Sequence, residues 1–113
     1  MKIDNSIRYL EVTIEGESTK EKYYGRFGIQ PFLKHAEKAD AQRLADKWTS
    51  GMDESSVKDF MRLLAYLSFH VKDATDAPWW TSNGLDLLDE APAYELAKQL
   101  DLVRTPKKTE ENV

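Results

Sequence analysis

The sequence predicts a mixed α+β fold, predominantly α, in which an N-terminal β-hairpin packs on three to four helices. Apolar and polar residues alternate between Ile7 and Ile29, which is the period of a β-strand. From Leu33 onward apolar residues recur at helical spacing. The chain has 113 residues, of which 41% are hydrophobic, so it can hold one core without covalent staples. We therefore expect one globular domain over residues 7–103, with disordered ends at residues 1–6 and 104–113.

Two strands joined by a polar loop make up the predicted hairpin. The residues expected to face the core are Leu10, Val12 and Ile14 in the first strand, and Tyr23, Gly25, Phe27 and Ile29 in the second. Gly16 is the turn former at the start of the loop. Gly25 and Gly28 weaken the second strand and indicate a bulge or the close approach of another segment.

Two helices are expected next, separated by Ser50–Gly51. The first has an apolar stripe formed by Leu33, Ala41, Leu44, Ala45 and Trp48. The second runs from about Val57 to Val71 and opens close to a capping box formed by Ser56 and Asp59. Its main apolar stripe consists of Val57, Phe60, Met61, Leu64, Leu67 and Val71. Tyr66 and Phe69 lie away from this stripe, and a helix with two apolar sides is typically the central helix of a domain or one that has a partner.

The segment after the second helix contains breaks and one further helix. Residues 73–78 interrupt the helical pattern, and residues 85–88 are long enough for only a helical turn or two. Asp86, Asp89 and Glu90 are typical of turns and helix starts, and Pro92 suits the first turn of the last helix. The stripe of that helix is Ala93, Leu96, Ala97, Leu100 and Val103.

Charge and composition exclude several classes of protein. The net charge is −4, which disfavours non-specific binding to nucleic acid or to an anionic membrane. The chain has no cysteine, which excludes a disulfide framework, a thiolate zinc site and a cysteine nucleophile. It also lacks an apolar run near the roughly 18 residues of a membrane span, and its first residues have no signal-peptide core. These features favour a soluble, cytosolic protein.

No motif in the sequence indicates catalysis or a cofactor. His70, Asp73 and Asp76 match no standard metal-ligand spacing, and we expect a surface histidine followed by two turn-forming aspartates. A Gly-rich phosphate loop and a nucleophile motif are both missing. We therefore expect no enzyme activity, no metal and no cofactor. The basic face of residues 34–43 is diluted by acidic residues, so a helix-turn-helix DNA reader is poorly supported.

An aromatic surplus indicates a binding surface for a protein partner. Trp79 and Trp80 are adjacent, and a small domain has difficulty burying both rings completely. The candidate partner-binding residues are Tyr66, Phe69, Trp79 and Trp80, because exposed aromatic residues are enriched in interfaces. We expect Trp80 to be the more exposed of the pair, since polar residues follow it directly.

The order of these features resembles the tail assembly chaperones of long-tailed, siphovirus-type bacteriophages. The resemblance rests on Tyr23-Tyr24-Gly25-Arg26-Phe27-Gly28-Ile29-Gln30-Pro31-Phe32-Leu33, on the two helices that follow, on Ala77-Pro78-Trp79-Trp80, and on Asn83-Gly84-Leu85. It covers about Tyr9 to Leu102. It implies a non-enzymatic protein that binds the tape measure protein, brings tail tube subunits to it in the host cytoplasm, and is absent from the mature virion. It also leaves an all-α fold as the alternative, with residues 7–29 helical.

The resemblance further implies a short and a long product of one gene. Such families make the longer form by a −1 ribosomal frameshift, and Pro106-Lys107-Lys108 permits a slippery site in the codons. The longer form is then a candidate for recruiting the tube protein, and a homo-oligomer is a further expectation. Two other classes remain open: a structural virion component, such as a head–tail connector or tail-completion protein, and a DNA-binding regulator.

Overall fold

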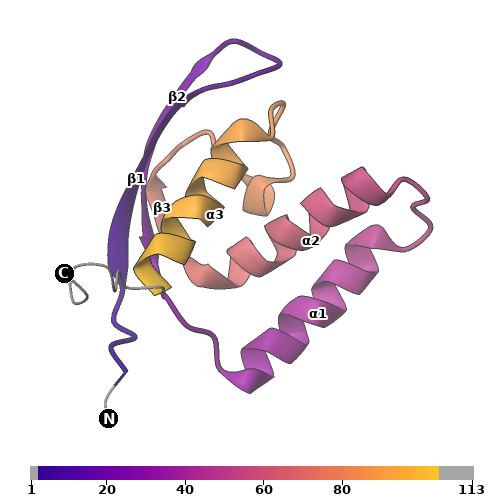
Figure 1. Ribbon diagram of the computed structural model, residues 1–113, viewed down its shortest axis with the longest axis horizontal. Helices are drawn as coiled ribbons and strands as arrows, with labels where there is room; N and C mark the ends of the chain where they lie inside the picture. Colours follow the sequence, from indigo (N-terminus) through magenta and orange to yellow (C-terminus); the bar gives the residue numbers. More distant parts are fainter. Residues whose placement is uncertain (1–2, 105–113) are drawn as a thin grey trace, which may run out of the picture.

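The computed structural model of the protein describes residues 3–104 and has a mixed α+β architecture (Figure 1). Its elements are β1 (Arg8–Glu15), β2 (Lys22–Ile29), α1 (His35–Thr49), α2 (Ser55–His70), β3 (Val71–Asp76), a short 3-10 turn η1 (Ser82–Gly84) and α3 (Ala91–Arg104). The strands form one antiparallel sheet in the order β1-β2-β3. The α+β prediction is confirmed, and the all-α alternative is wrong because residues 8–15 and 22–29 pair as strands.

The hairpin of β1 and β2 follows the predicted alternation. Its register runs from Arg8 opposite Ile29 to Glu15 opposite Lys22 without interruption. Val12, Phe27 and Ile29 are fully buried on the inner face, whereas their sequence neighbours on the outer face of β1 and at Arg26 are exposed. The period of two therefore determined which side of the hairpin faces the core.

The third strand is the main element that differs from the sequence prediction. Residues 73–78 are predicted as a break, yet Val71–Asp76 pairs with β2, with Ile29 opposite Val71 and Arg26 opposite Asp76. Aspartate is a poor strand former, and the segment has no apolar alternation. The open backbone groups of β2 supply the pairing instead, which local propensity does not report.

The two glycines of β2 make the close approaches that their positions indicate. A Cβ at Gly25 would lie 2.7 Å from the Cβ of Ala77, and one at Gly28 would lie 3.0 Å from Asp73 Cβ. The pairing of β2 with β3 is also irregular around Gly28. The missing side chains thus allow the segment that follows α2 to lie directly against the strand.

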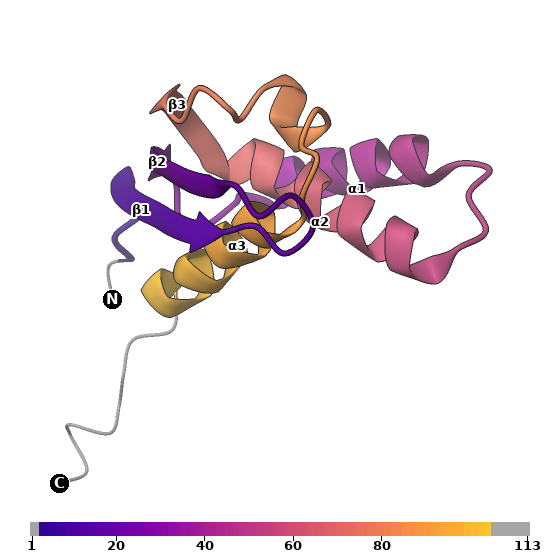
Figure 2. The same ribbon diagram turned by 90° about the horizontal axis from the view of Figure 1, so that it is seen from above.

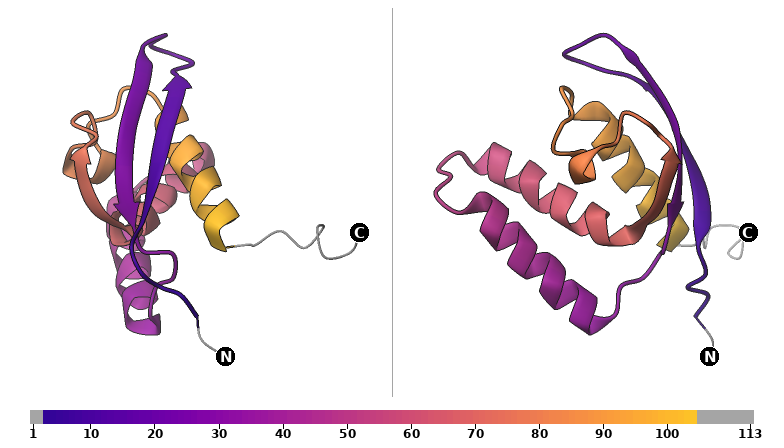
Figure 3. Two further views of the ribbon diagram at one scale, coloured as in Figure 1. Left: turned by 90° about the vertical axis from the view of Figure 1, so that its left-hand side faces the viewer. Right: turned by 180° about the vertical axis from the view of Figure 1, so that it is seen from behind.

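The helices pack in a defined order on the inner side of the sheet. Figure 3 shows that α2 lies between α1 and the sheet, so the predicted central helix is confirmed. Seen from above, α3 lies alongside β1 (Figure 2), and Gln99 Nε2 donates a hydrogen bond of 2.6 Å to the carbonyl oxygen of Glu11. This bond covers part of the open edge of β1. The predicted capping box does not form: Glu54 occupies the N-cap of α2, and Ser56 Oγ donates to its carboxylate at 2.8 Å.

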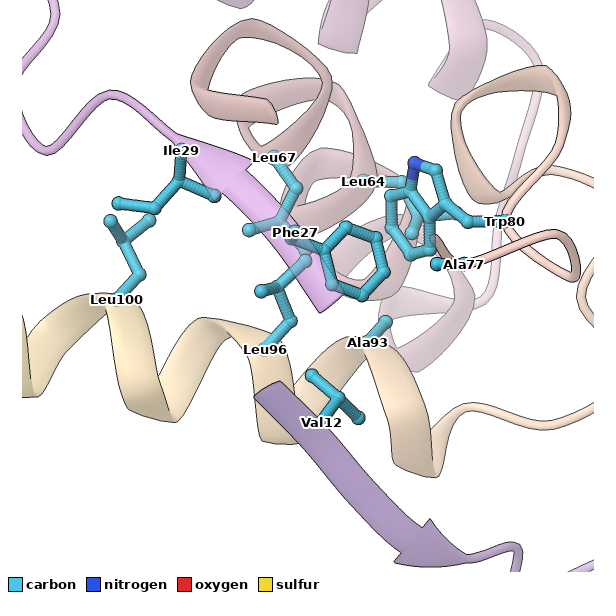
Figure 4. Close-up of a cluster of buried hydrophobic side chains, with 10 residues drawn as sticks. All are labelled: Val12, Phe27, Ile29, Leu64, Leu67, Ala77, Trp80, Ala93, Leu96 and Leu100. Atoms are coloured by element: carbon cyan, nitrogen blue, oxygen red, sulfur yellow. The ribbon is translucent and has the colours of Figure 1, made fainter. Parts of the chain in front are cut away.

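The core lies where the sheet meets α2 and α3. Figure 4 shows the side chains that converge there: Val12, Phe27, Ile29, Leu64, Leu67, Ala77, Trp80, Ala93, Leu96 and Leu100. The predicted stripes of the second and last helices supply the α2 and α3 members of this cluster. The turn expected at residues 85–88 instead occurs slightly earlier, at Ser82–Gly84.

Asp89 fastens the hairpin loop to the start of α3. Its Oδ2 accepts hydrogen bonds from the backbone N–H groups of Ser18 at 2.9 Å and Thr19 at 3.0 Å, and its Oδ1 accepts one from the N–H of Ala91 at 3.0 Å. These donors, the backbone of Thr19 first, hold the pKa of the Asp89 carboxyl well below its usual range. The prediction of a helix-start role for Asp89 is confirmed, and the residue also has a long-range role that the sequence does not show.

Replacing Asp89 with asparagine should lower the melting temperature near neutral pH. The fall of the melting temperature from neutral to acidic pH should also be smaller in the variant than in the parent. A carboxyl with a depressed native pKa stabilises the fold above its unfolded-state pKa of about 3.9, and this contribution is lost as the pH falls below that value. Asparagine has one oxygen and cannot serve both sets of donors. Thermal unfolding between about pH 7 and about pH 2 measures the difference. Asp53→Asn, at an exposed position ahead of α2, is the control, and parallel pH profiles of Asp89→Asn and the parent would contradict the expectation.

Candidate partner-binding groove

Trp80 is a core residue, contrary to the expected greater exposure. It is 8% exposed, and its ring meets the ring of Phe27 edge-on with centroids 5.4 Å apart. The chain turns after β3, with the N–H of Trp80 donating to the carbonyl oxygen of Ala77 at 2.9 Å, and this turn directs the indole inward. Gly84 leaves room for it, since a Cβ there would lie 3.0 Å from the Trp80 ring. The polar residues that follow Trp80 therefore do not indicate that its side chain is exposed.

Trp79 covers the part of the β2 edge that lies beyond the end of β3. Its indole Nε1 donates a hydrogen bond of 2.8 Å to the carbonyl oxygen of Tyr24. Its ring meets Tyr23 and Phe27 edge-on, at centroid distances of 5.3 and 5.6 Å. The half-buried Trp79 side chain thus pairs with strand backbone and packs on the sheet, and these contacts account for its place in the fold.

Of the four predicted partner-binding residues, Tyr66 lines two hollows on the helical side of the molecule. Its hydroxyl donates to Oε1 of Gln42 on α1 at 3.2 Å, which holds the ring between the helices. Phe69 is half-buried on the same helix, and it lines neither of the hollows that Tyr66 lines. The structure therefore does not bring the four predicted aromatic residues into one surface.

Two adjoining hollows share the side chains of Tyr66, His70 and Arg104. The smaller has a volume of about 140 Å³ and is completed by Phe32, Leu33 and Lys38. The larger has a volume of about 300 Å³ and is completed by Leu63, Leu67, Ala97, Leu100 and Asp101. A cavity of about 150 Å³ holds a benzene molecule, so each hollow has room for an apolar side chain of a partner. We call the two hollows together the groove.

His70 forms part of the groove wall and is buried, with 4% of its surface exposed, which corrects the expected surface histidine. Its Nδ1 lies 2.7 Å from the carbonyl oxygen of Gln30, and the N–H of Gln30 donates to the carbonyl oxygen of His70 at 2.8 Å. Because a carbonyl oxygen only accepts, Nδ1 carries the proton. Burial lowers the pKa of the imidazole, so the ring is neutral near pH 7.

A metal site at His70, Asp73 and Asp76 has no support in the geometry. Within residues 3–104, no three His, Asp or Glu side chains gather where they could hold an ion. The Asp73 carboxylate accepts hydrogen bonds from the Tyr9 hydroxyl at 3.1 Å and from the Thr75 hydroxyl at 2.7 Å. The Asp73 carboxylate is thus already held by hydrogen bonds to residues of β1 and β3.

Several groove residues were not singled out from the sequence. Leu63 belongs to neither of the apolar stripes that the sequence predicts for α2. Arg104, which the sequence predicts in the disordered tail, is the last residue of α3. One feature of the sequence could identify Leu63 as a groove residue. It lies three residues before Tyr66 and seven before His70, and this spacing places the three residues along one side of a helix. The sequence predicts Ala97 in the apolar stripe of the last helix; in the structure it is half-buried and lines the larger hollow.

Comparison with protein-family models, curated proteins and solved structures gives no match to this chain. Within the described part of the chain, no helix combines the length and the apolar character needed to cross a bilayer.

Proposed function

We propose that this protein is a tail assembly chaperone of a long-tailed bacteriophage, which binds the tape measure protein and helps to recruit tail tube subunits. The observation that supports the proposal best is the groove at Tyr66, open to solvent and floored by apolar side chains of α2 and α3. A tape measure protein is a long helical chain that needs its apolar side chains covered before the tube forms around it. Grooves of this kind bind amphipathic helices through apolar side chains at helical spacing.

The proposal includes the place and the time of action. The protein acts in the host cytoplasm, is absent from the mature virion and uses no metal or cofactor. A longer frameshifted product recruits the tube protein, and its slippery site would lie at Pro106-Lys107-Lys108, outside the described residues. Reading the nucleotides tests this part, since codons incompatible with slippage, or a closed −1 frame beyond them, would remove the long form.

Co-expression with the long helical reading frame next to its gene tests the chaperone role. We expect the tape measure protein to stay soluble and to co-purify with the chaperone. Leu63→Glu should weaken the complex at least about tenfold, because a charge replaces an apolar wall of the groove. Ala97→Glu tests the facing wall from α3 in case the first variant is unstable.

Leu88→Glu is the matched control, because Leu88 is 83% exposed and lies outside the groove. Circular dichroism verifies that each variant is folded. If the client stays insoluble, the chaperone proposal is wrong. If the groove variants and the control bind the client equally, the groove is not its binding site. Recovery of the protein in purified particles would favour a structural virion component, and a salt-sensitive shift of duplex DNA would favour a regulator.

A further inference from the structure

The groove is one end of a longer apolar seam between α2 and α3. Both helices run from upper right to lower left in Figure 1, and the rings of Phe60 and Tyr94 lie 5.5 Å apart near their N-terminal ends. Near their C-terminal ends, His70 and Arg104 line the same hollows. From Phe60 to His70 the seam spans ten residues of α2, or about 15 Å. It is therefore long enough for about three turns of a helix.

The apolar side chains of this seam are only partly covered. Tyr94 is 48% exposed, while Phe60, Leu63 and Ala97 are half-buried. These residues line up along the two facing sides of the helices rather than being scattered singly. A contiguous apolar strip of this kind indicates an interaction surface.

The seam carries opposite charges at its two ends. At the Tyr94 end, burial and then the carboxylates of Glu90 and Asp59 raise the pKa of the Tyr94 hydroxyl, so both carboxylates act on this end. Asp59 is paired with Arg62 at 3.3 Å, whereas Glu90 takes part in no ion pair within residues 3–104.

At the groove end the uncompensated charge is positive. Lys38 lines the smaller hollow and takes part in no ion pair among the described residues. Arg104 lines both hollows, and its charge is shared with Asp101 at 2.6 Å. Glu37, which also lies near His70, is paired with Lys72 at 3.6 Å. Of the charged residues that these contacts place at the two ends, Glu90 at one end and Lys38 at the other have no ion-pair partner among residues 3–104.

We infer that the seam binds an amphipathic α-helix in one direction, with the N-terminal end of that helix at Glu90 and its C-terminal end at Lys38 and Arg104. A helix has a partial positive charge at its N-terminus and a partial negative charge at its C-terminus, which matches these ends. The inference rests on the proposed function, since the client is helical. It adds that the client segment has an apolar stripe at helical spacing, basic side chains in its first turn and acidic ones in its last turn.

Two synthetic peptides of about 14 residues test the direction. They share one leucine stripe, have blocked termini and are held helical by a side-chain lactam. One has lysines in the first turn and glutamates in the last, and the other has the reverse. We expect the first to bind about three- to thirty-fold more tightly in fluorescence anisotropy at low salt, from a favourable charge contact at each end. High salt should reduce the difference.

Lys38→Glu should abolish or invert this preference, whereas Lys22→Glu, at an exposed position on the hairpin, should leave it unchanged. Equal affinity of the two peptides, the reverse preference, or binding of neither peptide would overturn the inference. A dimer that dissociates in Leu63→Glu would also overturn it, because a second copy would then fill the seam. If the peptides show the expected preference but the tape measure protein does not co-purify, the proposed function fails and the helix-binding seam stands. If the client co-purifies through the groove and the peptides show no preference, only the direction fails.

Discussion

Replacing Trp80 with alanine should lower the free energy of unfolding by about 3–5 kcal/mol, the range for truncating a large buried aromatic side chain. The ring is 8% exposed and packs edge-on against Phe27. Removing it leaves a cavity between β2 and α2, beside Leu64 and Gly84, which the rigid sheet cannot close. Urea denaturation followed by circular dichroism measures the loss. Binding of the client by the fraction that remains folded should change little, since Trp80 lines neither hollow of the groove.

Tyr24→Ala is the control for this experiment, because that ring is 60% exposed on the outer face of the sheet. Trp79→Phe adds a second comparison: it removes the hydrogen bond to Tyr24 and should cost about 0.5–1.5 kcal/mol. A loss below about 1 kcal/mol for Trp80→Ala, together with weaker client binding, would return Trp80 to the partner surface and contradict its place in the core.

Leu64→Ala should cost about 2–5 kcal/mol, the range for truncating a leucine in a core. Leu64 is 1% exposed and lies at the centre of α2, where its Cδ2 would be 2.9 Å from a Cβ built on Gly84. Gly84 has a φ of 88°, so the turn that presses on Leu64 uses a conformation that favours glycine. The cavity left by the substitution should therefore also loosen this turn.

Leu88→Ala is the matched leucine control and should change stability by less than about 0.5 kcal/mol, because that side chain is 83% exposed. Equilibrium unfolding in urea gives both values. A loss below about half a kcal/mol for Leu64→Ala would mean that Leu64 does not belong to the core, and would contradict the place of α2 between the sheet and α1.

The groove shows how far prediction of the site could go. The sequence predicts Tyr66 as a partner-binding residue because it lies off the main stripe of α2, and Tyr66 does lie in the groove. Arg104 and Lys38 join it from the end of α3 and the start of α1, and no pattern in the sequence indicates that these distant residues meet. The surplus of aromatic residues predicts that Trp79 and Trp80 bind a partner. Composition, however, does not distinguish a ring that binds a partner from one that fills a core.

The sequence by itself determined the elements with a strong period. Val12 and Phe27 face inward because strand residues alternate, and Leu96 faces inward because its helix has one apolar stripe. Only the tertiary structure decided the pairing of Val71–Asp76 with β2, the burial of Trp80 and His70, and the attachment of the hairpin loop to Asp89. The physical reason is the range of the interactions. Periodicity records which face of one element is apolar, whereas an open strand edge, a space above a glycine and a set of backbone donors exist only once distant segments have come together.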